Sequence, residues 1–452
     1  MSYKWPLVKL DNIKAHTKYS CVGGPFGSSL SRKHYTEEGV PVLRGVNLGS
    51  DQFFDSDFVY VSKEKAAELH RNMAYPNDVV FTQRGTLGQV AIIPKNARYS
   101  SYVVSQSQMK LTVNSEIAHP YYIYSFFRTD KAKQQIETHA IVGGVPHINL
   151  GILKALEIPL PPLNIQKKIV NIIRSIDQKI TLNTQTNQTL EEMAQAIFKS
   201  WFVDFDPVKA KMNGEQLEGM DAATASLFPD KLVESELGLI PEGWPVDQVG
   251  KHLDVTKGKS YKSAELQEST TALVTLKSFK RGGGYRMDGL KEYTGKYKPQ
   301  QVIEAGDLVM SLTDVTQAAE IVGKPALVID APQYDTLVAS LDVAILRPKE
   351  TDAKQYFYGL MSTYRFHRYA ESFATGTTVL HLSPKGITTF EFACPSAELV
   401  KKYHEFAAPI FAKIEANILE SQELAKLRDT LLPKLLSGEI ELGQAQELAE
   451  VE

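Results

Sequence analysis

The sequence predicts an α+β fold in which two duplicated mixed α/β domains are separated by two long helices. The helices are expected to form an antiparallel coiled coil with pseudo-two-fold symmetry. Three observations predict this fold: an internal repeat, short β-type runs bounded by turn residues, and two long apolar stripes at helical spacing. A chain of 452 residues can hold such a duplication, because domains usually contain about 100 to 200 residues.

The internal repeat becomes visible when the chain is shifted by 234 positions against itself. The shift aligns Tyr122 with Tyr356, Glu137 with Glu371, His147 with His381, Pro161 with Pro395, and Leu190 with Leu424. Identity is low, but residue classes agree in order along the chain. A repeat of about 200 residues is far longer than a solenoid repeat, so the sequence indicates two copies of one domain.

Each copy begins with a mixed segment rich in Gly, Ser, Thr and aromatic residues. Its β-type runs are expected at 79–82, 90–93 and 109–113 in the first copy, and at 308–311, 326–329 and 341–346 in the second. One helix is expected near 120–139 and its counterpart near 352–373. A proline-containing segment then ends each mixed segment, at 159–162 and at 394–395.

A long helix follows each mixed segment. Apolar residues recur at alternating steps of three and four from Ile169 to Trp201, and again from Phe406 to Leu435. The 40 residues of 163–202 would span about 60 Å as a helix. Duplicated halves commonly relate by a two-fold axis, and an axis perpendicular to the helices pairs them antiparallel.

Both stripes become polar at matched positions in the middle. These positions are Asn183 and Asn187 in the first stripe, and Asn417 and Ser421 in the second. A chance polar patch is one interpretation, and a polar layer that sets the register of the helix pair is the other. Pro409 is expected to kink the second helix near its start.

These features divide the chain into six segments. They are a first mixed domain at 1–160, a central helical region at 161–204, a linker at 205–242, a second mixed domain at 243–395, a C-terminal helical region at 396–438, and an acidic tail at 439–452.

Charge is distributed unevenly along these segments. The total of -3 taken alone argues against a nucleic-acid binder. Residues 1–160 nevertheless carry 18 Lys and Arg against 13 Asp and Glu, and residues 244–300 carry 11 against 6, so each has a local net charge of +5. Residues 204–242 have a net charge of -6 and the tail has -5. Random fluctuation explains these differences about as well as a binding role does.

The composition places the chain among cytoplasmic proteins. No apolar run approaches the ~18 residues of a membrane span, and the N-terminal residues lack the apolar stretch of a signal peptide. Cys21 and Cys394 are expected to be free thiols in a reducing compartment.

The sequence shows no catalytic or metal-binding motif. Gly258-Lys259-Ser260 resembles the end of a P-loop, but Leu253 stands where that loop requires glycine. The ten His and two Cys have no metal-ligand spacing. We therefore expect neither catalytic residues nor a bound metal.

The loops instead suit contact with phosphates and base edges. Arg and Gln can make bidentate contacts to guanine and adenine, and backbone amides of Gly/Ser-rich loops can meet phosphates. Candidates in the first copy are Pro25, Phe26, Gly27, Ser28, Arg44, Arg84, Gly85, Thr86, Gly88, Gln89, Gln106, Gln108, Gly143, Gly144 and His147. Candidates in the second copy are Lys257, Lys259, Tyr261, Lys262, Lys277, Lys280, Arg281, Tyr285, Arg286, Thr377, Thr378 and His381. An ordinary surface loop is the alternative for each segment, and a capping or packing role is the alternative for the two histidines.

Four sequence segments resemble segments of the specificity subunit of type I restriction-modification enzymes. They are Pro159-Leu160-Pro161-Pro162-Leu163 at the start of the first long helix, 198–208 at its end, 234–244 before the second mixed domain, and 427–438 at the end of the chain's second long helix. The resemblance spans the whole chain and includes its duplication.

The resemblance implies a noncatalytic, DNA-binding role. In this family two target recognition domains each read one half of a split, asymmetric sequence in double-stranded DNA. The two helices pair as a spacer and dock two methyltransferase subunits, and motor-nuclease subunits join the complex. S-adenosylmethionine, ATP and Mg²⁺ are then expected only in the partner subunits.

Motifs of the family are clearer in the first domain than in the second. The segments 25–28, 84–88 and 143–147 match family patterns, whereas 257–260 and 377–381 depart from them. Two other functions remain open. The chain could be a fragment or subunit with its own methyltransferase or nuclease activity, or a coiled-coil adaptor that does not read DNA.

Overall fold

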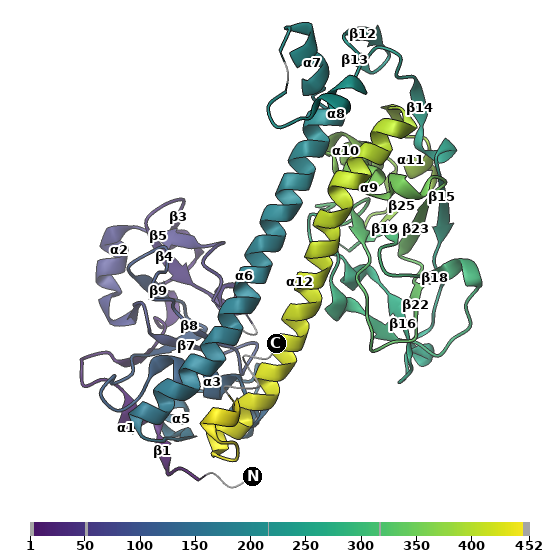
Figure 1. Ribbon diagram of the computed structural model, residues 1–452. Coiled ribbons are helices and arrows are strands. Elements are labelled where there is room, and N and C mark those ends of the chain that lie inside the picture. The colour runs from purple at the N-terminus through teal and green to yellow at the C-terminus, as the bar shows by residue number, and fades with distance from the viewer. Residues whose placement is uncertain (1–3, 50–52, 216, 316–317, 446–452) are drawn as a thin grey trace. The chain divides into compact units, whose positions relative to one another are not determined.

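The computed structural model describes residues 4–49, 53–215, 217–315 and 318–445. Figure 1 shows its ribbon and labels many of its helices and strands. The chain divides into two compact units, of which unit 1 consists of Met1–Leu182 and Glu420–Glu452, and unit 2 of Asn183–Leu419. The division falls inside both long helices, so each unit contains one mixed domain and part of each helix.

Unit 1 is built around an antiparallel sheet with the strand order β2-β10-β7-β8. Its strands are β2 (Cys21–Gly23), β7 (Val79–Thr82), β8 (Val90–Ile92) and β10 (Gln108–Leu111). Side chains alternate between the two faces of a strand. Val79 and Phe81 therefore pack in the same cluster as helix α3 (Pro120–Arg128), while Val80 packs against Tyr102 and Val104 of the second sheet. Both faces are buried, which explains the continuous apolar run in the sequence.

The second sheet of unit 1 has the order β3-β5-β4-β9-β6, with β4 and β9 parallel and the other neighbours antiparallel. Its strands are β3 (Tyr35–Thr36), β4 (Val40–Leu43), β5 (Val59–Val61), β6 (Met73–Ala74) and β9 (Tyr102–Val104). The remaining elements are α1 (Leu10–Ile13), α2 (Lys63–Glu68), α5 (Leu150–Ala155), and the antiparallel pair β1 (Leu7–Lys9) and β11 (Glu157–Pro159).

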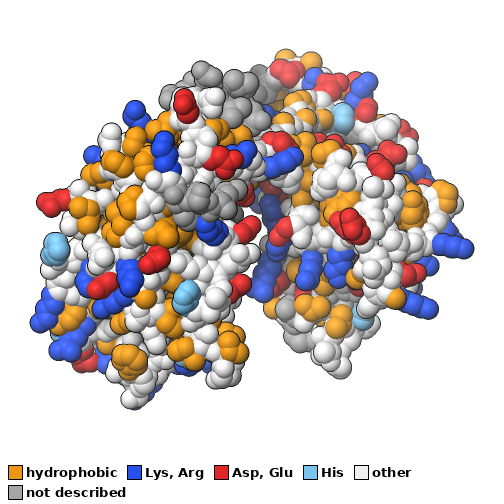
Figure 2. Space-filling model, turned by 90° about the horizontal axis from the view of Figure 1, so that it is seen from below, with side chains coloured by type: hydrophobic (Ala, Val, Ile, Leu, Met, Phe, Trp, Pro, Cys, Tyr) orange, Lys and Arg blue, Asp and Glu red, His pale blue; other side chains and the backbone are white. Residues whose placement is uncertain are grey.

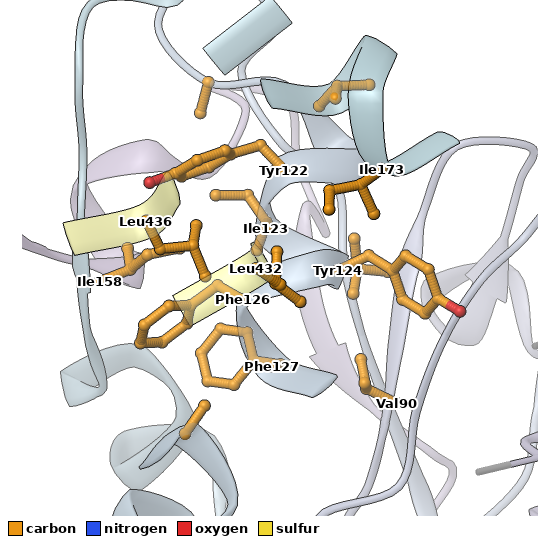
Figure 3. Packing of buried hydrophobic residues seen from close by; sticks show 14 of the residues in the cluster. Val90, Tyr122, Ile123, Tyr124, Phe126, Phe127, Ile158, Ile173, Leu432 and Leu436 are labelled. Atoms are coloured by element: carbon orange, nitrogen blue, oxygen red, sulfur yellow. The ribbon is translucent and has the colours of Figure 1, made fainter. Parts of the chain in front are cut away.

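The single helix expected near 120–139 is wrong, because two helices occupy this segment. α3 ends at Arg128, and α4 spans Asp130–Thr138. Thr129 between them is extended, and its side chain accepts a hydrogen bond from the backbone N–H of Ala132 as an N-cap. Figure 3 shows Tyr122, Ile123, Phe126 and Phe127 of α3 packed beside Leu432 and Leu436 from the second long helix.

Unit 2 repeats both sheets, which confirms the duplication. One sheet has the order β15-β23-β19-β21, with strands β15 (Leu253–Lys257), β19 (Leu308–Ser311), β21 (Pro325–Leu327) and β23 (Val343–Pro348). The other has the order β17-β16-β22-β18, with strands β16 (Thr271–Val274), β17 (Lys291–Glu292), β18 (Val302–Ile303) and β22 (Thr336–Ala339). As in unit 1, the second sheet contains one parallel pair, here β16 and β22.

The helices of unit 2 repeat the break seen in unit 1. α9 (Lys354–Ser362) and α10 (Tyr364–Ser372) meet at Thr363, which is extended and caps α10. Smaller elements are α11 (Lys385–Thr388), the pair β14 (Val246–Gln248) and β26 (Glu391–Ala393), and the sheet of β20 (Thr313–Asp314), β25 (Leu380–Leu382) and β24 (Ala374–Thr375). The acidic linker is structured, with α7 (Asp206–Met212), α8 (Ala222–Ser226) and the hairpin β12 (Leu232–Ser235) and β13 (Gly238–Pro241).

The two long helices are α6 (Leu163–Phe202) and α12 (Ala397–Ser437), and they pack together in both units. In unit 1, Asp177 pairs with Arg428. In unit 2, Asn183 bonds to Asn417, and the Tyr403 hydroxyl donates to the carbonyl of Ala194. In these contacts the residue numbers rise along α6 as they fall along α12. The two helices therefore pair antiparallel, as predicted. The helix α12 continues without interruption through Pro409.

A buried charge cluster joins α3, α6 and α12 in unit 1. Asp177 accepts from Arg128 at 2.8 Å, from Arg428 at 3.0 Å and from the Tyr121 hydroxyl at 2.5 Å. Burial, together with this carboxylate, raises the pKa of Tyr121 well above its ordinary value. Two nearly buried guanidinium groups thus share this carboxylate, and Arg428 also pairs with Asp429 at 2.8 Å.

The acidic tail begins against the core of unit 1. Ile440, Leu442 and Ala445 pack with the apolar cluster there, whereas 446–452 lie outside the described residues. Among the residues that the structure describes, no helix is long and apolar enough to cross a membrane.

Candidate nucleic-acid interface

Strand register in unit 1 brings three candidate loops to one edge of the first sheet. Met109 pairs with Gly23, Gln108 with Thr82, and Phe81 with Val90. The loops 24–30, 83–89 and 105–107 therefore leave the sheet at the same end. We call this set, together with the turn 141–147, loop edge 1.

Hydrogen bonds tie these loops to one another. The side-chain amide of Gln106 donates to the carbonyls of Gly27 and Leu30. The Gly24 N–H donates to the Gln108 carbonyl at 2.9 Å. A Cβ on Gly24 would lie 1.9 Å from the carbonyl oxygen of Ser105, so only glycine fits there.

Arg84 occupies a clamped turn between β7 and β8. Its backbone N–H donates to the Ser107 carbonyl at 3.3 Å, and Arg84 forms an isolated β-bridge with His147. Gly85 and Gly88 have φ of 103° and 85°, a region that favours glycine. Within the described residues the exposed guanidinium has no hydrogen-bond or ion-pair partner.

The turn before His147 completes loop edge 1. Ile141 bridges His147, and Gly143 and Gly144 lie exposed at the tip between them. The His147 ring lies with Nδ1 3.3 Å from the Val145 carbonyl and is half-buried. Val142 in the same turn is 82% exposed.

The remaining candidates of unit 1 differ in whether their side chains are exposed and free to contact DNA. Phe26 is 84% exposed, and Gly27, Ser28 and Thr86 are also exposed, whereas Pro25 is buried. Three others are engaged within the unit. Arg44 donates to the Asp57 carbonyl at 2.7 Å, Gln89 accepts from Thr82 at 3.4 Å, and Gln108 is 1% exposed and bonds to Ser105.

Unit 2 forms the equivalent loop edge 2 from the described loop residues 258–262, 312–315, 318–324 and 340–342 and the turn 375–381. A Cβ on Gly258 would lie 2.1 Å from the carbonyl oxygen of Ser340, as at Gly24 and Ser105 in unit 1. His381 bridges both Thr313 and Thr375. His147 and His381 therefore hold the same backbone position in the two units.

Candidates of unit 2 near β15 are mostly accessible. Lys257 and Lys262 are exposed, and Lys259 and Tyr261 are half-buried. The Lys259 N–H donates to the Ala339 carbonyl at 2.7 Å, and the ammonium of Lys291 lies 5.8 Å from the centre of the Tyr261 ring. Thr377 and Thr378 are exposed beside His381.

Two ion pairs and a buried tyrosine hold the loop 276–290 in place. Arg281 pairs with Glu320 at 3.4 Å, and Arg286 pairs with Asp288 at 2.5 Å. Tyr285 is buried, and this burial raises its pKa. Lys277 and Lys280 remain exposed.

Several residues of the two edges were missed in the sequence. Gly24 and Gly258 lie one repeat apart, so the shift of 234 positions could have identified them. Lys133 of α4 could not be found in this way, but its Cγ would lie 3.4 Å from a Cβ on Gly88, which places it beside the Arg84 turn. Val315 on loop edge 2 is exposed.

The predicted polar layer forms cross-helix hydrogen bonds in unit 2. Asn417 donates to the side-chain oxygen of Asn187 at 2.8 Å, and Asn187 donates to the Ile414 carbonyl at 3.2 Å. Asn183 donates to the Asn417 carbonyl at 3.4 Å. Ser421 belongs to unit 1, where it is half-buried on α12.

One cysteine–histidine contact has the wrong chemistry for nucleophilic catalysis. Cys394 Sγ lies 3.8 Å from His252 Nε2, and the same nitrogen lies 3.0 Å from an oxygen of Asp247. Burial raises the pKa of Cys394 to about 11, so the thiol is protonated at neutral pH. Among the described residues, no three His, Cys, Asp or Glu side chains gather as a metal site would require.

On the face shown in Figure 2, surface charge alone does not mark an interface. Lys and Arg side chains there are interspersed with Asp and Glu. The two loop edges are therefore recognised by their backbone geometry and by their exposed side chains.

Comparison with known proteins identifies the domain. Residues 31–192 match the family model described as "Type I restriction modification DNA specificity domain". Over these residues the chain is similar to type I DNA specificity domains. The specificity subunit of the type I enzyme HindI from Haemophilus influenzae is 26% identical over 410 residues, covering 79% of this chain and 87% of that one. These findings confirm the recognition of a type I specificity subunit made from the sequence.

Two further similarities extend over nearly the whole chain. The MjaIX specificity subunit from Methanocaldococcus jannaschii is 26% identical over 458 residues, covering 97% of this chain and 94% of that one. The crystal structure of a type I S subunit from M. genitalium matches with a TM-score of 0.52 and 16% identity, and covers 96% of each chain. At this identity the structural match supports the fold alone, and it agrees with the mixed domains and paired long helices predicted for the specificity subunit.

Proposed function

We propose that the chain is a noncatalytic specificity subunit whose two units each read one half of a bipartite, asymmetric DNA sequence. The observation that carries this proposal is the repetition of one loop edge in both units. Each edge combines a glycine in close contact with the backbone, a bridged histidine and an array of exposed loop residues. A protein that recognises two different half-sites requires a similar backbone arrangement in both units with different side chains on it.

The long helices serve in this proposal as a spacer and a docking element. A spacer of constant length would hold the two half-sites at a fixed separation, because B-DNA repeats every ~34 Å along its axis. We further propose that the helical regions bind two methyltransferase subunits, through which motor-nuclease subunits join. In this assembly S-adenosylmethionine, ATP and Mg²⁺ belong to the partner subunits.

Methylation mapping tests this function directly. The chain is expressed in a host together with the methyltransferase subunit that accompanies it, and the modified sites of the genome are sequenced. We expect one motif with two defined halves and an undefined spacer of constant length. A motif with a single continuous sequence, or methylation that does not depend on this chain, would contradict the proposal.

The two alternative functions make different predictions. A fragment with its own methyltransferase activity would transfer methyl groups to DNA as a purified chain supplied with S-adenosylmethionine. A coiled-coil adaptor would leave DNA affinity of the complex independent of this chain's loops and of salt. We expect no methyl transfer by the chain alone, and an affinity of the complex that falls as salt rises.

A further inference from the structure

The two loop edges share one hydrogen-bonding frame, which allows their positions to be matched. The Gln83 N–H donates to the Ser107 carbonyl at 2.7 Å, and the Leu312 N–H donates to the Asp342 carbonyl at 2.7 Å. The next residue of each turn bridges the matched histidine, Arg84 in unit 1 and Thr313 in unit 2. Arg84 is therefore equivalent to Thr313, and Ser107 to Asp342.

Arg84 differs from the other candidate arginines because, among the described residues, its guanidinium has no hydrogen-bond or ion-pair partner. Arg44, Arg281 and Arg286 each bond to an oxygen of their own unit. The guanidinium of Arg84 has no such partner among the residues the structure describes, although its backbone is held by Ser107 on one side and by His147 on the other. A fixed backbone with a free guanidinium suits bidentate donation to a base edge.

Unit 2 carries the neutral Thr313 in place of Arg84, and the acidic Asp342 in place of Ser107. Thr313 is buried, and its hydroxyl donates to Asp342 Oδ1 at 3.1 Å. Asp342 itself is half-buried on the loop that corresponds to Ser105–Gln108. A carboxylate beside DNA is repelled by phosphates unless it accepts a hydrogen bond from a base donor.

We propose that Arg84 and Asp342 are specificity-determining residues of the two half-sites. Arg84 donates to N7 and O6 of a guanine in the half-site of unit 1. Asp342, oriented by Thr313, accepts from the exocyclic amine of a cytosine in the half-site of unit 2. The inference rests on the proposed function and assigns one base to Arg84 in unit 1 and one base to Asp342 in unit 2.

Methylation mapping of single variants tests the assignment, in the host system that contains the accompanying methyltransferase subunit. Arg84→Ala should relax one G·C position in one half of the motif by about 10- to 100-fold, leaving the other half unchanged. Asp342→Asn should relax one position in the opposite half only, and it keeps an acceptor for Thr313. Thermal unfolding of each purified variant verifies that the chain is folded.

Lys133→Ala provides the matched control, because Lys133 lies beside the same turn but on helix α4. A phosphate contact predicts uniformly weaker binding to all sequences and an unchanged motif. The proposal is overturned if the motif of Arg84→Ala is unchanged, or if that variant weakens binding to a randomised oligonucleotide library equally at every base. A wild-type chain without a two-part motif would instead contradict the proposed function itself.

Discussion

Single residues carry much of the frame that the two loop edges share. Gly24 and Gly258 lie so close to the backbone of Ser105 and Ser340 that no side chain fits, and the histidines at 147 and 381 bridge the neighbouring turn in each unit. These positions are the same in the two units, whereas Arg84 and Thr313 differ. The frame is therefore common to both units, and the side chains placed on it provide the difference between them.

The close approach at Gly24 makes a stability prediction. Gly24→Ala should lower the free energy of unfolding of unit 1 by about 1–3 kcal/mol or more, because the new Cβ must displace the Ser105 backbone. Gly143→Ala is the control, since a Cβ there meets nothing within 4 Å, and it should change stability by no more than about 0.5 kcal/mol. Denaturant unfolding of both variants measures the difference, and equal stability would contradict the account.

The buried charge cluster makes a second prediction. Asp177→Asn removes the carboxylate that Arg128 and Arg428 share, while Arg428 keeps its pair with Asp429, so stability should fall by about 3–5 kcal/mol. Lys179→Ala removes an ion pair with Glu420 that is more exposed, and its effect should be below about 1 kcal/mol. Thermal denaturation compares the two variants, and a loss of similar size in both would show that burial is not the cause.

At the scale of elements, the long helices and central strands could be predicted because their apolar periodicity is strong. The break at Thr129 could not, since a threonine between Arg128 and Asp130 carries no glycine or proline signal. Its capping bond to Ala132 becomes evident only in the structure. The burial of Gln108 and Tyr285 could not be predicted either, because residue type alone does not show which loop side chains are buried. Low identity between the loops obscured the equivalence of Arg84 with Thr313.

The polar layer between α6 and α12 permits a test of register. Asn187→Leu alone removes the hydrogen bond that the side-chain amide of Asn417 donates to Asn187, and should cost about 1–3 kcal/mol. The double variant Asn187→Leu, Asn417→Leu should recover part of this stability, because apolar residues suit the seam. Its spacer length in methylation mapping should become heterogeneous if the layer sets the register. A single unchanged spacer would show that packing elsewhere is sufficient.

At the scale of the whole molecule, the net charge of -3 conceals two locally basic domains and two acidic segments. Part of this acidity lies in the structured linker, and part at the tail that begins against unit 1. A chain with this overall charge is expected to bind DNA weakly by itself and tightly with its partner subunits. Titration of labelled DNA at several salt concentrations, with and without the methyltransferase subunit, measures both affinities. Equal affinities would contradict this expectation.

The central claim is that each unit reads its own half of the DNA target, and a domain exchange tests it most directly. Residues 1–160 are replaced by the corresponding segment of another specificity subunit, and the methylated sites of a host carrying the chimera and its methyltransferase are sequenced. The account predicts that one half of the motif changes while the other half and the spacer length stay the same. A change in both halves, or in neither, would contradict it.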